Sequence, residues 1–241
     1  MNVAKNAIIL AAGEGKRLRP MTDTAPKCMV EVCGRSILEN ALMLFARRGV
    51  ERTRIVVGHL APVVRERIGS SFKNMKIEYI ENADYATTNS MYSLHLGLQG
   101  LREATWVLEG DVFFEAAVLA KAVTQEVSWF VDAARKDLDG AYIRFDDSRR
   151  ALSLDIIRDL KLLSGQCGKS IGMLHLGARG TELFKRWLEE GVKAGQTNLY
   201  YDLIVGPHFN EAHVEAVDVG GMKWFEIDNL ADLENAQRMF S

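Results

Sequence analysis

Cysteine and proline are scarce in this sequence, and no broad excess of charge of either sign is present. The three cysteines, Cys28, Cys33 and Cys167, are an odd number without CxxC spacing, which argues against a disulfide framework or a zinc site. We expect Cys28 to be a packed thiol although it follows Lys27. The net charge of -2 provides no extended basic surface, so nucleic acid is not an expected partner.

Long hydrophobic runs are also missing. The apolar run at residues 7–12 is far too short to span a membrane, and no secretory cleavage pattern follows it. We therefore expect a cytoplasmic protein without a membrane partner, and a homodimer is left open. A chain of 241 residues can bury one sizeable core, and no linker rich in Pro, Gly or Ser divides it. Residues 1–241 are thus predicted to form a single domain.

Strand-like and helix-like segments alternate through the first half. Apolar or β-rich runs predict strands at 7–12, 54–57, 76–80 and 105–108, and amphipathic spacing predicts helices at 37–48, 62–68 and 89–98. This order favours an α/β, Rossmann-like fold with a mostly parallel mixed sheet and helices on both faces. Later strands at 129–133, 140–145 and 170–176, with a helix at 181–192, predict an antiparallel addition that forms a small acceptor-binding lobe.

Residues 7–27, AIILAAGEGKRLRPMTDTAPK, join a buried strand to a basic loop. Gly13 and Gly15 permit a tight turn whose N–H groups can face an anion, and nearby Lys and Arg side chains add positive charge. The spacing matches neither GxxxxGK[ST] nor GxGxxG, so from the turn alone a purely structural role is an equally good explanation. The whole string suits a nucleoside triphosphate.

Two parts of the sequence place carboxylates where they could bind a metal ion. Asp111 follows the strand predicted at 105–108, at the sheet edge where the loop should also lie, and Mg²⁺ prefers such carboxylates together with phosphate oxygens. Taken alone, Asp111 is more simply a turn or helix-capping residue. In KWFEID, Glu226 and Asp228 are two residues apart and share one face of a strand. Other acidic residues left open as substitutes are Asp218, Asp202 and Glu109.

The remaining polar residues carry weaker signals. The five histidines show no metal-ligand spacing, and His175, on a predicted central strand near the acceptor lobe, is the one for which a functional role is left open. Lys161 and Lys169 are expected to be ordinary exposed lysines, and a contact with phosphate is left open as the alternative.

The string LAAGxGxRLxP followed by PK resembles the signature of nucleotidyltransferases that activate sugar phosphates and related phosphorylated alcohols, and the mid-chain GD pair and late WxEID element are similar to theirs. The resemblance implies that residues 1–112 mainly bind nucleotide and that residues 113–241 mainly bind the acceptor and complete a metal site. It implies a Mg²⁺ cofactor held by Asp111, Glu226 and Asp228. The residues predicted to bind nucleotide are Leu10, Ala11, Ala12, Gly13, Glu14, Gly15, Lys16, Arg17, Lys27, Asn82, Thr87 and Thr88.

Two further stretches narrow the resemblance. NSMYSL at 89–94 and LYYD at 199–202 are similar to phosphocholine and 2-aminoethylphosphonate cytidylyltransferases, whereas the QxxPxG stretch common in sugar-phosphate members is absent. The resemblance favours CTP as donor and a small zwitterionic phosphonate or phosphate as acceptor. An ammonium group needs a carboxylate or aromatic face, and the anion needs cations. The residues predicted to bind the acceptor are Asn89, Ser90, Tyr92, Tyr200, Tyr201 and Asp202.

The expected reaction is in-line attack of the acceptor oxygen on the α-phosphorus of CTP, with Lys27, Arg17 and Asp111 as catalytic residues. Phosphocholine enzymes tend to place a tryptophan after a central strand that corresponds to residues 170–176, and its absence favours a primary-amine acceptor such as 2-aminoethylphosphonate. Two alternatives remain: a sugar-phosphate nucleotidylyltransferase that uses UTP or dTTP, and a non-catalytic regulatory module that binds nucleotide.

Overall fold

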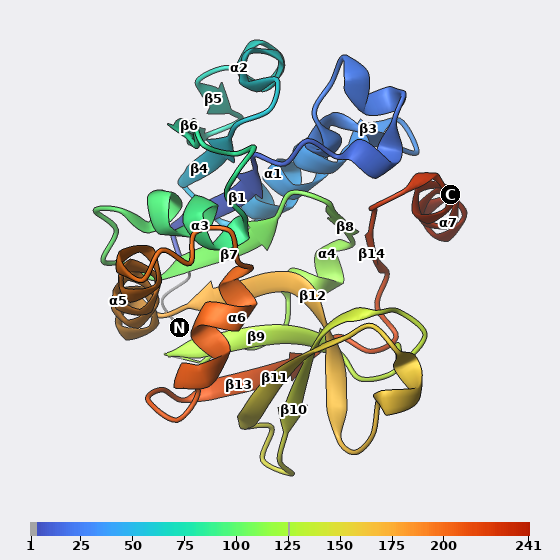
Figure 1. The fold of residues 1–241 in the computed structure, drawn as a ribbon. Helices are drawn as coiled ribbons and strands as arrows, with labels where there is room; N and C mark the ends of the chain where they lie inside the picture. Colours follow the sequence, from blue (N-terminus) through green and yellow to red (C-terminus); the bar gives the residue numbers. More distant parts are fainter. Residues whose placement is uncertain (1–3, 125) are drawn as a thin grey trace.

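The computed structural model describes residues 4–124 and 126–241 (Figure 1). A ten-stranded mixed sheet runs through the molecule in the order β11-β10-β12-β7-β1-β4-β6-β5, and β9 and β13 extend it from β12. The first half of the chain forms a parallel centre, because β7 and β4 both run parallel to β1, and β6 runs parallel to β4. These four strands are β1 (Asn6–Ala11), β4 (Arg52–Val57), β6 (Met75–Glu81) and β7 (Thr105–Glu109).

Helices cover both faces of this sheet, as predicted (Figure 1). Ile9 and Ile55 face one apolar core, and their neighbours Ile8 and Val56 face the other, because successive side chains of a strand point to opposite faces. The helices of the first core are α1 (Ile37–Arg48), α2 (Ala61–Ile68) and α4 (Ala116–Leu119). The helices of the second are α3 (Ser90–Leu98), α5 (Ala178–Lys193) and α6 (Tyr201–Val205).

Helix α1 has the ends that its sequence predicts. Ser36 accepts a hydrogen bond from the Glu39 backbone N–H, Glu39 accepts one from Ser36 in return, and Gly49 ends the helix with φ at 89°. The last helix, α7 (Leu230–Phe240), begins with the same kind of capping box between Asn229 and Asp232. Local sequence therefore determines where these helices begin.

The second half adds antiparallel strands. The long strand β12 (Cys167–Leu176) pairs antiparallel with β7, and so attaches the strands of the second half to the parallel centre of the sheet. The other strands that the second half adds to this sheet are β9 (Val127–Asp132), β10 (Gly140–Phe145), β11 (Ala151–Ile157) and β13 (Val214–Asp218). A separate pair joins β8 (Val112–Phe114) to β14 (Trp224–Glu226), and short strands lie at β2 (Glu31–Val32), β3 (Arg35–Ser36) and β5 (Ser71–Phe72). The mixed architecture confirms the predicted fold class.

Two sequence expectations are decided by burial. His175 on β12 is 4 % exposed and its ring packs 4.8 Å from that of Trp106, and burial lowers its pKa to about 4, so it is a core residue. Cys28 is also buried, as expected, and burial raises the pKa of its thiol to about 12. Within the described part of the chain, no helix is both long enough and apolar enough to cross a membrane.

Candidate active site

The basic loop after β1 folds back on itself and places Lys27 in a cavity. Gly15 adopts φ of 64°, and a Cβ there would lie 2.8 Å from the Cβ of Lys27, so only glycine allows this close approach. Thr22 Oγ1 donates a hydrogen bond to the Gly15 carbonyl at 2.9 Å and fixes the turn. The loop is therefore shaped around the stem of Lys27.

Gly110 brings the following aspartate to the same place. At the end of β7, the Gly110 N–H donates to the Leu10 carbonyl at 2.9 Å, and a Cβ at Gly110 would lie 2.5 Å from that oxygen. The GD pair thus has a physical reason, since a side chain at position 110 would collide with β1. Ile227 N–H then donates to the Asp111 carbonyl at 3.0 Å and attaches the C-terminal carboxylates to this edge of the sheet.

Lys27 bridges two carboxylates from distant parts of the chain. Its Nζ lies 2.7 Å from Asp111 Oδ2 and 2.5 Å from Asp228 Oδ1, and Arg17 Nη2 lies 2.8 Å from that same Asp228 oxygen. Burial opposes the charge of Lys27, but Asp111 and Asp228 outweigh it and raise the pKa of the lysine. Burial likewise opposes the charge of Asp228, and Lys27 and Arg17 hold its pKa below the usual range. Lys27 and Asp228 thus keep each other charged.

A second lysine pairs with a carboxylate of the last strand. Lys169 on β12 is buried, not exposed as expected, because β12 is covered along its whole length. Its Nζ lies 3.0 Å from Glu226 Oε2 and donates to the Ser170 carbonyl at 2.9 Å. The signal that was missed is its position within a run of small and apolar residues. Lys161 is exposed, as expected.

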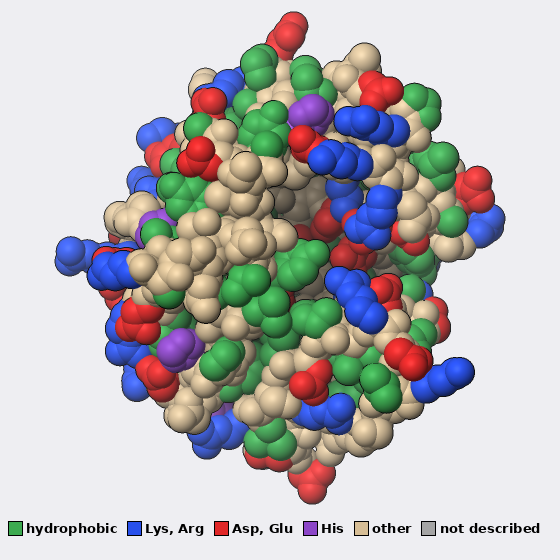
Figure 2. All heavy atoms as spheres, viewed as in Figure 1, with side chains coloured by type: hydrophobic (Ala, Val, Ile, Leu, Met, Phe, Trp, Pro, Cys, Tyr) green, Lys and Arg blue, Asp and Glu red, His purple; other side chains and the backbone are tan. Residues whose placement is uncertain are grey.

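Two cavities meet at these charged groups. The larger, of about 530 Å³, lies at the ends of β1 and β7, and the smaller, of about 230 Å³, lies against β10 and β12. Figure 2 shows the hollow with acidic side chains inside it and Lys and Arg side chains at its rim. The residues that line both cavities are Arg17, Glu109, Asp111, Tyr200 and Asp228.

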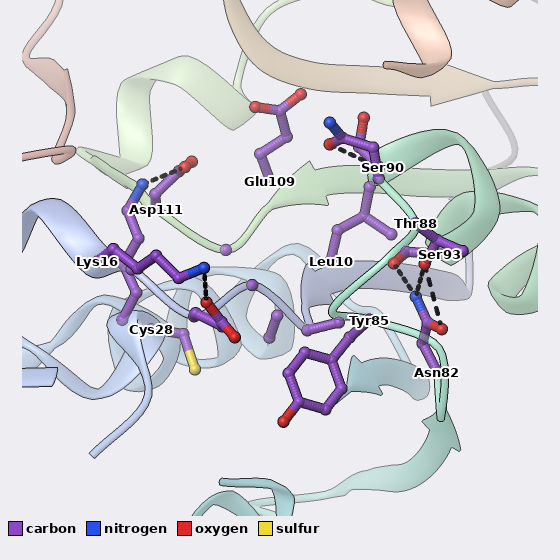
Figure 3. A pocket seen from close by; sticks show the side chains of 18 of the residues that line it. Leu10, Lys16, Cys28, Asn82, Tyr85, Thr88, Ser90, Ser93, Glu109 and Asp111 are labelled. Atoms are coloured by element: carbon purple, nitrogen blue, oxygen red, sulfur yellow. Dashed lines mark hydrogen bonds and ion pairs between the residues drawn. The ribbon is translucent and has the colours of Figure 1, made fainter. Parts of the chain in front are cut away.

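The predicted nucleotide-binding residues gather around the larger cavity. All of them line it except Thr87, which is exposed and donates its hydroxyl to the Asp84 carbonyl at 3.2 Å, and Asn89 and Ser90 line it too. Figure 3 shows Leu10, Lys16 and Asn82 around this space. Tyr85 and Ala86 also line it, within the segment 82–90 from which base contacts were expected, whereas Cys28, Ser93 and Gly110 were not predicted there from the sequence.

Asn82 connects the residues on one side of the larger cavity by hydrogen bonds. Its buried amide donates to Thr88 Oγ1 at 3.0 Å and to Ser93 Oγ at 3.1 Å, and its Oδ1 accepts from the Asp84 N–H at 3.1 Å (Figure 3). Because these bonds already occupy the Asn82 side chain, its contribution is to shape the segment 82–90.

The predicted acceptor residues separate into three groups, of which the first, Asn89 and Ser90, lines the larger cavity. Tyr200 and Asp202 line the smaller cavity, whereas Tyr92 and Tyr201 line neither. Tyr92 stacks on His95 with ring centroids 6.1 Å apart, and Tyr201 is fully buried against Trp129. Their YSL and YYD patterns therefore mark packing positions at these two tyrosines. The smaller cavity is also lined by residues that were not predicted from the sequence, namely Asp139, Arg158, Ser170 and Phe225.

Carboxylates crowd the boundary between the cavities. Glu109, Asp111 and Glu226 each offer an oxygen within 4.8 Å of the others, whereas Asp228 is engaged by Lys27 and Arg17. Burial, then the charges of Asp111, Asp202 and Glu226, raise the pKa of Glu109 well above its usual value. Burial raises the pKa of Asp202 to about 6, although Lys169 opposes this.

This arrangement fits a divalent cation. Asp111 Oδ1 is buried and finds no hydrogen-bond partner within residues 4–124 and 126–241. An orphaned carboxylate oxygen beside two further carboxylates is the type of donor set that Mg²⁺ prefers. The structure therefore brings Asp111 and Glu226 together as predicted, and adds Glu109, which the sequence offered only as a substitute.

Comparison with known proteins relates the whole chain to one family. Residues 7–189 match the family model of the MobA-like NTP transferase domain. The CMP-5'-(3-aminopropyl)phosphonate synthase of Streptomyces rubellomurinus is 33% identical over 99% of this chain, which spans 39% of the length of that relative. The 2-aminoethylphosphonate cytidylyltransferase of Lancefieldella rimae is 24% identical, with 95% of this chain and 90% of that protein covered.

A solved structure has the same fold. The CTP:phosphocholine cytidylyltransferase of Streptococcus pneumoniae superposes with a TM-score of 0.80 at 23% identity, over 99% of this chain and 100% of the other. The similarity extends over both the parallel and the antiparallel part of the sheet.

Proposed function

Since the chain belongs to the family of MobA-like NTP transferase domains, we propose that it is a Mg²⁺-dependent cytidylyltransferase that transfers CMP from CTP to a small aminoalkylphosphonate and releases pyrophosphate. One observation carries the proposal. The two cavities, each with its own largely buried lysine, meet at a shared wall that contains Asp111. A transfer between two bound substrates needs this arrangement.

The larger cavity suits the donor. Lys27 and Arg17 offset the charge of the triphosphate, and the loop 13–17 faces it with backbone groups. Glu109, Asp111 and Glu226 offer oxygens within 4.8 Å of one another, and Asp228 is linked to Asp111 through Lys27. A Mg²⁺ ion held by Asp111, Glu226 and Asp228, with Glu109 close by, would neutralise charge on the α-phosphate and orient the attacking oxygen. Catalysis then rests on positioning and electrostatics, and no protein nucleophile is needed.

The smaller cavity suits a zwitterion. Lys169 offers a cation for the phosphonate, and Asp202 and the rim residue Tyr200 offer a carboxylate and an aromatic face for the ammonium group. No tryptophan lines this cavity within the described chain, which favours a primary amine over a quaternary one. The names of the relatives support CTP as donor and an aminoalkylphosphonate as acceptor.

A substrate screen tests the proposal. Purified protein with MgCl₂ is incubated with each of the four NTPs, crossed with 2-aminoethylphosphonate, 3-aminopropylphosphonate, phosphocholine and several sugar phosphates. We expect pyrophosphate release to be highest with CTP and an aminoalkylphosphonate. Activity only with UTP or dTTP and a sugar phosphate would assign the protein to the sugar-phosphate branch, and nucleotide binding without release from any pair would indicate a regulatory binder.

Substitution of Lys169 distinguishes binding of the acceptor from binding of the donor. We expect Lys169→Met to raise KM for the phosphonate about 10-fold or more, since a charge-assisted hydrogen bond contributes roughly 1.5–3 kcal/mol. KM for CTP should stay within about two-fold, because Lys169 lines only the smaller cavity. The matched control is Lys161→Met, because Lys161 is exposed and lies outside both cavities. We expect this variant to have the KM values of the wild type for both substrates. Equal losses for both substrates would contradict the assignment of Lys169 to the acceptor.

A further inference from the structure

Lys27 lies where a cation shared by Asp111 and Asp228 would lie. Its ammonium nitrogen is 2.7 Å from Asp111 Oδ2 and 2.5 Å from Asp228 Oδ1, and the side chain is only 15% exposed. The lysine thus neutralises two of the carboxylates proposed to hold the metal. The same lysine is proposed to bind the triphosphate, so it has two alternative sets of partners.

The Lys27 ammonium cannot pair with these carboxylates while a metal ion binds the same oxygens. Mg²⁺ binds oxygen at roughly 2.0–2.1 Å, and an ammonium within hydrogen-bond distance of the same oxygens would lie close to it and repel it. Arg17 already adds a second positive group, 2.8 Å from Asp228 Oδ1. A metal that uses Asp111 Oδ2 and Asp228 Oδ1 must therefore displace the Lys27 ammonium.

The local structure allows this movement of the ammonium. The Cβ of Lys27 packs closely against Gly15, which holds the stem in place. The outer bonds of the side chain extend into the larger cavity, which both Lys27 and the loop 13–17 line. A lysine stem rotates freely about these bonds. Its ammonium can therefore exchange carboxylates for phosphates while the backbone stays fixed.

We propose that Lys27 holds the place of the metal in the free protein, and that a divalent cation binds tightly only when nucleotide phosphates draw the ammonium away from Asp111 and Asp228. This inference rests on the proposed function. It makes metal and nucleotide binding mutually reinforcing, because whatever draws the lysine away for one ligand favours the other to the same extent. The free protein is then protected from binding a divalent cation unproductively.

The test measures metal binding without nucleotide. Mn²⁺, whose free ion is visible by electron paramagnetic resonance, serves as the probe for wild type, Lys27→Met and Lys16→Met. We expect Lys27→Met to bind Mn²⁺ at least ten-fold more tightly than wild type, and adding Asp228→Asn to remove the gain. Lys16 pairs with Glu14 instead, so Lys16→Met should leave the affinity unchanged. Equal or weaker binding by Lys27→Met would overturn the inference.

A second measurement covers the stability of the variant, since Lys27→Met removes the ammonium that pairs with both carboxylates. Added MgCl₂ should raise the Tm of Lys27→Met clearly more than that of wild type, because a ligand that binds only the folded state stabilises it. Equal shifts would also overturn the inference, and would point to a cation among Glu109, Asp111 and Glu226 with Lys27 still in place. Neither measurement depends on turnover. A negative result would therefore overturn only this inference, and the substrate screen would still test the proposed function.

Discussion

Replacing Lys27 with methionine is expected to lower kcat for pyrophosphate release by about 10²–10³-fold, the usual cost of removing one preorganised charge from a transition state. Lys27 is the largely buried cation of the larger cavity, and its position is set by Gly15 behind it. Methionine keeps most of the stem and removes the ammonium. Release of pyrophosphate from CTP, measured at saturating acceptor, is the readout.

The control for this variant is Lys5→Met. Lys5 pairs with Glu51 on the surface and lines neither cavity, so its loss should not change turnover. Circular dichroism and Tm establish that both variants are folded. Near-normal turnover by Lys27→Met would contradict the proposed role of the loop. Lys27→Met is thus expected to have two opposite effects: tighter metal binding without nucleotide, and a slower chemical step.

Replacing Asp111 with asparagine is expected to lower kcat by a similarly large factor, about 10²–10³-fold or more. Asp111 lines both cavities, pairs with Lys27 through Oδ2 and has an orphaned buried Oδ1. Asparagine preserves the shape but removes the charge that both the lysine and a divalent cation require. Single-turnover measurements with CTP and 2-aminoethylphosphonate would show a loss in the chemical step.

Asp218→Asn is the matched control for Asp111. The sequence left Asp218 open as a metal ligand, but the structure pairs it with Arg149 and with the backbone N–H of Ala133, and it lines neither cavity. We expect it to retain turnover within about two-fold. If Asp218→Asn lost activity while Asp111→Asn kept it, the proposed assignment of the metal carboxylates would be wrong.

Much of the fold was predictable from neighbouring residues. The strand at 7–12, the helix that begins after Ser36 and the later strand at 140–145 all lie where apolar spacing and capping placed them. The edge strand β11 was missed, because Leu152 and its neighbours are partly exposed and give no clear buried pattern. Short strands such as β8 and β14 depend on pairing with each other across the chain.

The sequence by itself determined the loop and the GD pair, because glycine at fixed offsets is a local property. The expectation that Glu226 and Asp228 share one strand face was wrong, because β14 ends at Glu226 and Asp228 lies beyond it. Only the tertiary structure decided which charges meet. Lys27 and Asp228 are separated by 201 residues, and Lys169 is buried by strands that pair with β12 on both sides. The charge state and role of an ionisable group depend on its burial and on its neighbours in space. Periodicity along the chain carries no information about either.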